Sequence, residues 1–310
     1  MKNFVILADI ACDLSEEIRS AIGMNDYLPG HVHIDDGRDF PTTLDWTNIS
    51  REEFYKTVGN KNRKVTSAPP NLDEYYACFE KYVKEGVAVL SMSISSKISA
   101  TFNFADTAAK RIRENYPEAQ IYALDTLRMS SAFGLLVVYA HMLKNEGKTF
   151  EEVIAWLEAN KRRVHQMGPI DDLIFVARRG RITMGKAIMG SIVGVKPMGD
   201  CNTDGYVTVL TKAKGISKAF DITTKYIRET ATDIEKQIVI IAHSDREVYA
   251  EKLAEMISAE LKPAKLYITD VFSGSGTNVG PGMVGVYYLG NEISEGLEAE
   301  KEAMARATAK

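Results

Sequence analysis

The stretch that decides the fold runs from Val87 to Ala105 and reads VAVLSMSISSKISATFNFA. Its first four residues are a short apolar run, which is long enough for a buried strand. Hydroxyl-bearing residues dominate the middle, and from Thr101 onward apolar residues recur at helical spacing until Pro117. The stretch therefore predicts a strand that continues through a serine-rich loop into a helix.

The serine-rich loop allows two interpretations. Helix N-termini leave N–H groups unpaired and carry partial positive charge, so they bind anions well. We place Ser99 at the N-cap and expect Ser95, Ser96 and Thr101 to add hydroxyl donors for a small anion. The plainer alternative is that these residues only cap the helix and turn the chain.

A second hydroxyl-bearing loop lies earlier in the chain. Thr66 and Ser67 stand before Ala68-Pro69-Pro70, where the prolines exclude a helix and hold the backbone extended. Asn71 then caps the next predicted helix. In an α/β sheet such loops lie at the same edge of the strands, where ligands bind, so we expect both loops to face one ligand.

Length and composition limit the class of protein. The 310 residues favour two domains, which we place at residues 1–165 and 166–290, with a peripheral helix or tail at 291–310. The net charge of -4 gives no reason to expect nucleic acid or an anionic membrane as a partner. No apolar run of about 18 residues occurs, so we expect no integral membrane segment. The short apolar run at the N-terminus ends at Asp9, so it predicts a strand and no signal peptide.

Few residues suggest a metal site or a disulfide. The three cysteines Cys12, Cys78 and Cys201 are far apart and odd in number, which predicts free thiols in the cytoplasm. Four neighbouring residues could ligate a metal: His31, His33, Asp35 and Asp36. The alternation His-Val-His-Ile followed by Asp-Asp-Gly is explained more simply as a strand and a turn, so we expect no metal.

Strands and helices alternate in the first half. Apolar runs predict strands at Phe4–Ala8 and Ile121–Leu124. Capping boxes predict helices that begin at Asp13, Ser50 and Thr149. The alternation favours an α/β fold with a mainly parallel sheet and helices on both faces.

The second half has a different pattern. We take Gln166–Pro169 as the linker. The runs Val193–Met198 and Tyr206–Leu210 flank a turn rich in Asn, Asp and Gly, which predicts a β-hairpin. Further strands and helices follow, so we expect a mixed α+β domain. Helices are predicted at Ile216–Ile227 and Glu247–Leu261, and strands at Gln237–Ala242, Leu266–Val271 and Met283–Leu289.

A glycine-rich stretch, Ser273–Gly282, lies between two predicted strands. It matches neither the dinucleotide fingerprint, because a strand follows it, nor the Walker loop, because it lacks Gly-Lys-Ser/Thr. Two interpretations stay open: a wide turn with left-handed residues, or a loop whose backbone approaches a ligand closely. The histidines show no catalytic order, so we predict a binding protein and no catalytic residues.

Six segments, taken in order, resemble the DegV family. They are Leu7–Leu14, Thr66–Pro70, Ser95–Phe102, Asp125–Gly134, Arg178–Ile182 with Val195–Pro197, and Asn278–Gly282. The resemblance implies a two-domain α/β protein that binds one long-chain fatty acid between its domains. The DegV family includes the fatty-acid-binding subunits of bacterial fatty acid kinase systems, which present the acyl carboxylate to a separate kinase.

The resemblance also assigns residues. Thr66 and Ser99 would hold the carboxylate. Other carboxylate-binding residues would be Ser67, Ser95, Ser96, Asn278 and Gly280. Arg181 matches the arginine linked to kinase docking or phosphotransfer.

Four residues depart from the family pattern: Asn278 for histidine, Ile10 for serine, and Ala100 and Arg179 for glycine. Arg179 adds a charge to the loop that presents the ligand.

A fatty acid also needs an apolar tunnel. We expect the helix Ala132–Leu143 and the segment Ile182–Val195 to line it. One rival hypothesis is an enzyme that acts on a small phosphorylated metabolite through the same helix N-terminus. It would need metal ligands or a basic clamp near Ser99, and the sequence shows neither. The other rival is a regulatory domain that binds no lipid.

Overall fold

The structure, a computed structural model, describes residues 3–183 and 194–309. Its first sheet has the order β2-β1-β6-β7, and all three strand pairs are parallel. The strands are β1 (Phe4–Asp9), β2 (Tyr27–Leu28), β6 (Ala88–Ser93) and β7 (Ile121–Asp125). The predicted parallel sheet is confirmed, and the strand of the opening stretch is its central strand β6.

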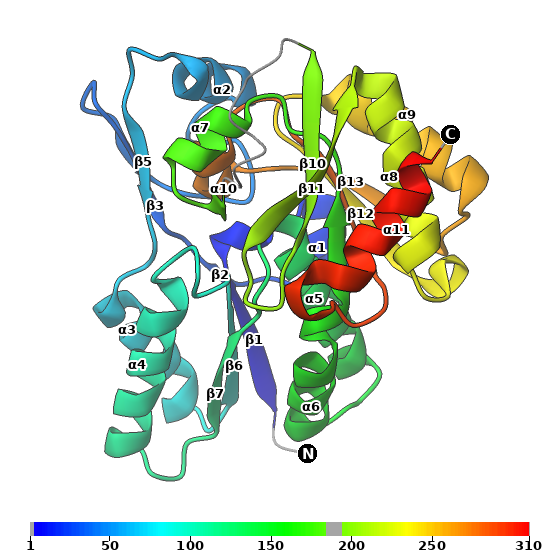
Figure 1. The fold of residues 1–310 in the computed structure, drawn as a ribbon. Helices are drawn as coiled ribbons and strands as arrows, with labels where there is room; N and C mark the ends of the chain where they lie inside the picture. The colour runs from blue at the N-terminus through cyan, green and yellow to red at the C-terminus, as the bar shows by residue number, and fades with distance from the viewer. Residues whose placement is uncertain (1–2, 184–193, 310) are drawn as a thin grey trace.

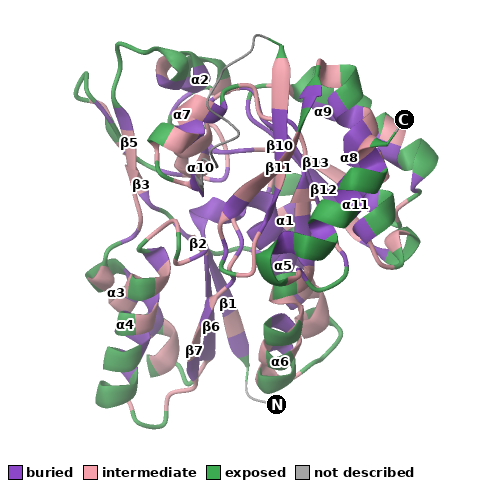
Figure 2. Ribbon diagram, viewed as in Figure 1, coloured by how far each residue is buried: buried purple, intermediate pink, exposed green. Residues whose placement is uncertain are grey.

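Helices cover both faces of this sheet, as predicted. Side chains alternate along β1, so Leu7 packs towards one layer of helices while Ile6 and Ala8 pack towards the other. The helices on the Leu7 side are α3 (Leu72–Lys84) and α4 (Thr101–Asn115). Those packed on the opposite side are α1 (Glu16–Ile22), α5 (Ser130–Asn145) and α6 (Phe150–Asn160). Figure 2 shows the strands buried and the outward helix faces exposed.

Helix α5 is buried almost all round, and it packs against strands of both halves of the chain. Gly134 makes this packing possible, because a Cβ there would lie 2.2 Å from the carbonyl oxygen of Cys12. The expectation that small residues at the start of this helix allow close approach is confirmed. α5 therefore joins the two halves into one hydrophobic core.

A small antiparallel sheet, which we call the outer sheet, has the order β4-β3-β5. Its strands are β3 (His31–Ile34), β4 (Asp39–Pro41) and β5 (Val65–Ala68), and α2 (Arg51–Gly59) packs on it. Although these residues belong to the first half of the sequence, they contact the second half. Arg51 Nη1 and Trp46 Nε1 donate to Asp270 at 3.2 and 2.9 Å, and Tyr55 donates its hydroxyl to the carbonyl of Val271.

The C-terminal sheet has the order β13-β12-β14-β8, with β12 and β13 parallel and the other pairs antiparallel. The strands are β8 (Val164–Met167), β12 (Ile238–His243), β13 (Lys265–Asp270) and β14 (Val284–Leu289). Helices α8 (Ile216–Thr230) and α9 (Glu247–Glu260) pack on it, whereas α10 (Ser273–Val279) lies against the outer sheet and α11 (Glu298–Thr308) packs on α8. Gln166 and Met167 thus lie in β8, so the predicted linker is wrong, and the predicted domain limits remain a prediction.

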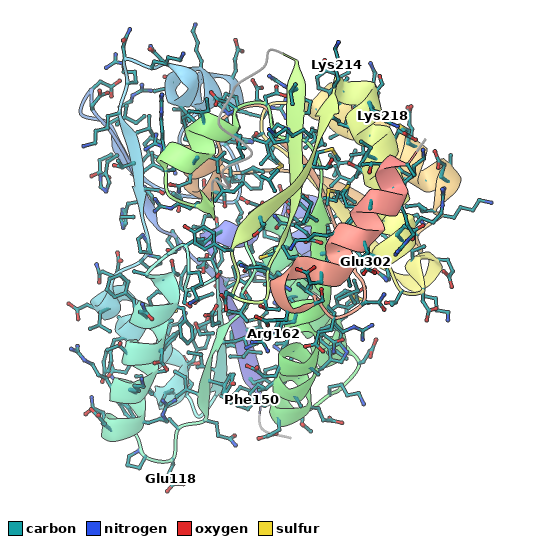
Figure 3. All side chains as sticks on the ribbon, in the orientation of Figure 1. Glu118, Phe150, Arg162, Lys214, Lys218 and Glu302 are labelled. Carbon is teal, nitrogen blue, oxygen red and sulfur yellow. The ribbon has the colours of Figure 1, made fainter. Side chains whose placement is uncertain are left out.

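The predicted hairpin is confirmed by the antiparallel pair β10 (Val195–Cys201) and β11 (Val207–Lys214), which has a bulge between Met198 and Gly199. β9 (Ile182–Thr183) pairs with β11, and α7 (Leu173–Arg178) precedes it. The closed end of the hairpin points towards the first sheet (Figure 1), where Arg162 Nε donates to the carbonyl of Thr203 at 3.4 Å. Figure 3 labels Arg162 near this end of the hairpin.

Local capping predictions had mixed outcomes. The predicted capping box forms at Thr149, and Asn71 caps its helix as predicted, with a full box. At Ser50 only half of the predicted box forms, in which Ser50 accepts the N3 amide of its helix. Asp13 does not begin α1 as predicted: it is buried with a φ of 48°, and Ser15 is the N-cap of α1. Single turns of 3₁₀-helix complete the list of elements: η1 (Ile10–Cys12), η2 (Lys161–Arg163), η4 (Ile234–Lys236) and η5 (Glu295–Leu297).

The glycine-rich stretch differs from expectation, whereas the C-terminus takes one of its two expected forms. Residues 273–279 form helix α10 and no wide loop, because its serine and threonine side chains and its small residues pack tightly beneath the outer sheet. Left-handed glycines occur only after the helix, at Gly280 and Gly282. At the C-terminus, where a peripheral helix or a tail is predicted, the structure has the helix α11, which buries Ala303 and Met304 against α8.

Candidate ligand-binding cavity

A cavity of about 630 Å³ lies where the first sheet, the outer sheet and the second half meet. Most of its wall is apolar, and the second half contributes Met167, Ile170, Leu173, Val176, Met198 and Val209. Its size falls in the range of ~300–1,000 Å³ that is typical of small-molecule sites. Polar groups reach its wall from both halves of the chain, among them the loops after β1 and β6, the outer sheet and α10.

Ser67 and Asn278 meet at the cavity from distant parts of the sequence. Asn278 Nδ2 donates to Ser67 Oγ at 3.1 Å, and both residues line the cavity. Thr66 does not line it. Successive side chains of a strand point to opposite faces, and Thr66 pairs with His33 on the solvent side of the outer sheet. The structure thus brings Ser67 and Asn278 together and leaves Thr66 apart.

The hydroxyls of the serine-rich loop face two different parts of the protein, the cavity and the hairpin. Ser96, Ser99 and Thr101 line the cavity, and the hydroxyls of Ser99 and Thr101 lie 2.6 Å apart. Ala100 is the N-cap of α4, so the predicted N-cap at Ser99 is wrong, although Ser99 Oγ accepts the amide of Thr101 at 3.3 Å. Ser95 is fully buried and donates to the carbonyl of Gly205 at 2.9 Å, so it faces the hairpin and not the cavity.

Positive charge on the described wall of the cavity comes from Lys97 and Arg181. The Arg181 guanidinium donates to the backbone carbonyl of Arg179, which fixes its direction. Gly280 does not line the cavity. Its left-handed backbone packs under Phe175, whose ring would lie 2.8 Å from a Cβ, so its role is structural in this arrangement.

Two buried carboxyls stand at or beside the wall. Asp9 lines the cavity and accepts the amides of Ala11 and Ile94 at 2.8 and 2.9 Å. Burial raises its pKa to about 6 despite these hydrogen bonds. Asp13 lies behind the wall, where it accepts Ser130 Oγ at 2.7 Å, and burial raises its pKa to about 7. Asp9 is also the N-cap of η1, and its position at the cavity was not predicted.

Other wall residues were also missed or misplaced by the sequence reasoning. Helix residues Ala132–Leu143 were expected to line the tunnel, but they form the shared core of the two halves. Of the segment Ile182–Val195, Ile182 lines the cavity, and residues 184–193 lie outside the described part of the chain. Polar residues without a sequence signal also contribute: Thr42, Asn103, Ser130, Gln166 and Ser275.

The part of the chain that the structure describes contains no group of three or more His, Cys, Asp or Glu residues able to hold a metal. His33 Nδ1 lies 2.8 Å from Asp39 Oδ2, and His31 Nε2 lies 3.3 Å from Glu74 Oε1. Both histidines lie on β3, which a turn follows, so the strand and turn are confirmed. The three cysteines are free, as predicted. Across residues 3–183 and 194–309, no helix has the length and apolar character needed to cross a membrane.

Comparison with known proteins agrees with the geometry. Residues 3–291 match the model of the DegV family, whose members are described as uncharacterised. A DegV domain-containing protein from Clostridium perfringens is 32% identical over 94% of this chain and 99% of its own. The solved structure of DegV from Bacillus subtilis, described as a fatty acid binding protein, has a TM-score of 0.78 at 25% identity and covers 94% of this chain and 100% of its own. A DegV family protein from Thermus thermophilus, described by its fatty acid binding, has a TM-score of 0.82 at 24% identity, with 94% and 100% covered. The chain belongs to the DegV family, as its ordered motifs indicated.

Proposed function

We propose that this chain binds one long-chain fatty acid in the cavity. The observation that carries the proposal is a single space of about 630 Å³ whose wall is mostly apolar but includes hydrogen-bonded hydroxyl and amide groups. Burying roughly 14 methylenes at ~0.8 kcal/mol each gives a gross gain of about 11 kcal/mol. The hydrocarbon chain should therefore dominate affinity, while the polar groups orient the ligand.

The carboxylate is proposed to bind at Ser67, Ser96, Ser99 and Asn278, which all line the cavity. Since Ser67 Oγ accepts from Asn278, its own proton is free to be donated to a carboxylate oxygen. Thr66, Ser95 and Gly280 leave the proposed set, because their side chains or backbone face other parts of the protein.

The charge on the wall favours a lipid over a phosphorylated metabolite. The carboxyl group of Asp9 lies on the same wall as the positive charges of Lys97 and Arg181. Within the described residues, no set of three or more His, Cys, Asp or Glu side chains could hold a metal there. A phosphate carries about two negative charges and would need a stronger basic clamp than this. A fatty acid carries at most one charge, which neutral hydroxyls can hold.

The protein is proposed to act as a binding partner rather than as an enzyme, and to present the acyl carboxylate to a separate kinase. Arg181 supports this role, because it lines the cavity in the segment that resembles the family's kinase-linked arginine. The cytoplasm remains the proposed location, since Cys12, Cys78 and Cys201 are all free thiols.

Native mass spectrometry of the purified protein tests the binding proposal. We expect an added mass equal to one long-chain fatty acid, which organic extraction then releases in a one-to-one ratio. The control is protein stripped of lipid, which should regain the mass when palmitic acid is added. A nucleotide or sugar phosphate mass would support the enzyme instead, and the absence of any stoichiometric ligand before and after palmitic acid would refute lipid binding.

A further inference from the structure

Arg179, which stands where the resemblance predicts glycine, makes a contact between two distant segments. It follows α7, and its Nη1 donates to the backbone carbonyl of Val65 at 2.9 Å. Val65 lies in β5, an edge strand of the outer sheet, and edge strands leave outward carbonyls open to other donors. The Val65 side chain is fully buried in the core of that sheet, so its carbonyl is held in place.

The other surroundings of Arg179 show that its charge is not used in an ion pair. Its guanidinium lies over the Phe175 ring, 5.1 Å from the centroid. Within the described residues no carboxylate approaches Arg179 to ion-pair distance, and burial, with Arg181 nearby, lowers its pKa. A half-buried cation that is desolvated without a counter-ion costs free energy. The carbonyl of Val65 and the face of Phe175 are the contacts that offset this cost.

The contact joins two walls of the cavity. Ser67 lies two residues after Val65, and Arg181 lies two residues after Arg179. Ser67 and Arg181 both line the cavity, whereas Val65 and Arg179 do not. The hydrogen bond therefore fastens the strand that carries Ser67 to the segment that carries Arg181, just outside the cavity. Arg179 also orients Arg181 directly, because its backbone carbonyl accepts from the Arg181 guanidinium.

We propose that Arg179 is a positioning residue that fastens these two walls and thereby slows both the uptake and the release of the ligand. The inference rests on the proposed function, since it concerns the same cavity. Arg179 does not line the cavity, so its loss removes no contact with the ligand. A residue that touches the ligand changes mainly the dissociation rate. A contact that only holds the two walls together instead changes the association and dissociation rate constants in the same direction, and it leaves the dissociation constant nearly unchanged.

Stopped-flow kinetics with a fluorescent long-chain fatty acid test this rate pattern. Arg179→Met keeps the aliphatic stem over Phe175 but removes every donor. Arg178→Met is the matched control, because Arg178 is exposed and adjacent. We expect Arg179→Met to raise both rate constants about tenfold, as befits a charge-assisted hydrogen bond, with the dissociation constant changed less than about twofold. Arg179→Lys, which retains a donor, should recover part of the slow kinetics.

The outcomes separate this inference from the proposed function. If wild type binds the fatty acid and both rate constants are the same in Arg179→Met, the fastener is refuted while lipid binding stands. If only dissociation accelerates and affinity falls with it, Arg179 contacts the ligand and the inference is also wrong. If wild type binds no fatty acid, the proposed function fails.

Hydrogen exchange of the ligand-free protein tests the fastener without any ligand. The amides of residues 65–68 should exchange severalfold faster in Arg179→Met than in wild type, and Arg178→Met should match wild type. Equal exchange in all three proteins would refute the contact. Thermal unfolding of each variant shows whether the change is local, since a global loss of stability would raise exchange in every strand.

Discussion

Replacing Ser67 with Ala should weaken recognition of a carboxylate, whereas replacing its neighbour Thr66 with Ala should not. The two residues are adjacent in β5 and have similar hydroxyls, but they point to opposite faces of the outer sheet. Ser67 lies in the cavity wall and accepts from Asn278 at 3.1 Å. Thr66 pairs with His33 on the other face, which makes Thr66→Ala a matched control.

The size of the effect follows from the hydrogen bond that is lost. A hydrogen bond to a charged group is worth about 1.5–3 kcal/mol, and one between neutral groups about 0.5–1.5 kcal/mol. Asn278 keeps its amide at the site after the Ser67→Ala change, so we expect the lower limit, about 1.5 kcal/mol, or roughly tenfold in the dissociation constant. A fatty alcohol of the same length lacks the charge, so its affinity should fall only about threefold.

Isothermal titration of lipid-free protein with palmitic acid and with hexadecanol measures this difference. Wild type should prefer the acid, and Ser67→Ala should lose part of that preference while unfolding at the temperature of wild type. Thr66→Ala should keep the wild-type preference. The reasoning is refuted if Ser67→Ala discriminates acid from alcohol as wild type does, or if Thr66→Ala loses as much.

Three further predictions concern pH and packing. His165 Nδ1 lies 2.6 Å from Asp200 Oδ2 and its Nε2 lies 2.9 Å from the carbonyl of Asn291, so each ring nitrogen faces an acceptor. Burial lowers its pKa, but Asp200 more than offsets this and the pKa is raised, so the stability it adds is present below about pH 6.5 and is lost as the pH rises through the folded pKa. The unfolding free energies of wild type and His165→Gln should therefore differ more at pH 6 than at pH 9, and a difference that does not change with pH would contradict this. Asn278→His should make fatty acid affinity fall as the pH rises from 6 to 8, whereas the affinity of wild type should be nearly constant above pH 7. Identical pH profiles and identical acyl phosphate formation with a fatty acid kinase would show that residue 278 is not at the carboxylate. Gly205→Ala should destabilise the protein by about 2 kcal/mol in urea unfolding, because φ is 88° and the new Cβ would lie 2.2 Å from the hydroxyl of Ser95. An unchanged unfolding midpoint would show that the closed end of the hairpin tolerates a side chain.

Local patterns were enough to predict the elements of the fold. The apolar runs at residues 4–8 and 87–90 became adjacent parallel strands, because an apolar run flanked by helices must be buried on both faces. The capping box at Thr149 and the cap at Asn71 formed as predicted, since each depends only on residues three apart. The hairpin turn likewise formed from its own residues.

The same patterns misjudged elements whose neighbours are distant in sequence. Apart from Val279, residues 273–279 are glycines and short polar residues, yet they form helix α10 because the outer sheet packs over it. Gln166 is predicted to lie in a linker, but its backbone N–H donates to Asp200 Oδ1 and its strand joins the C-terminal sheet. Helix propensity and turn composition act locally, and tertiary packing outweighs them when it buries more surface.

For the site, the sequence by itself determined which segments meet: hydroxyls before two helices, a glycine-rich stretch and an arginine-rich loop all reach one cavity. Only the tertiary structure decided which residue of each segment faces it. Ser67 and Ser96 line the cavity while their neighbours Thr66 and Ser95 do not, and no composition or spacing distinguishes the members of either pair. For Thr66 and Ser67 the physical reason is that side-chain direction alternates along a strand, and for Ser95 and Ser96 it is the turn that begins at Ser95 after β6. A shift of one residue in the register with β3 or in the contact with the hairpin would exchange the two, and those registers depend on the packing of the whole molecule.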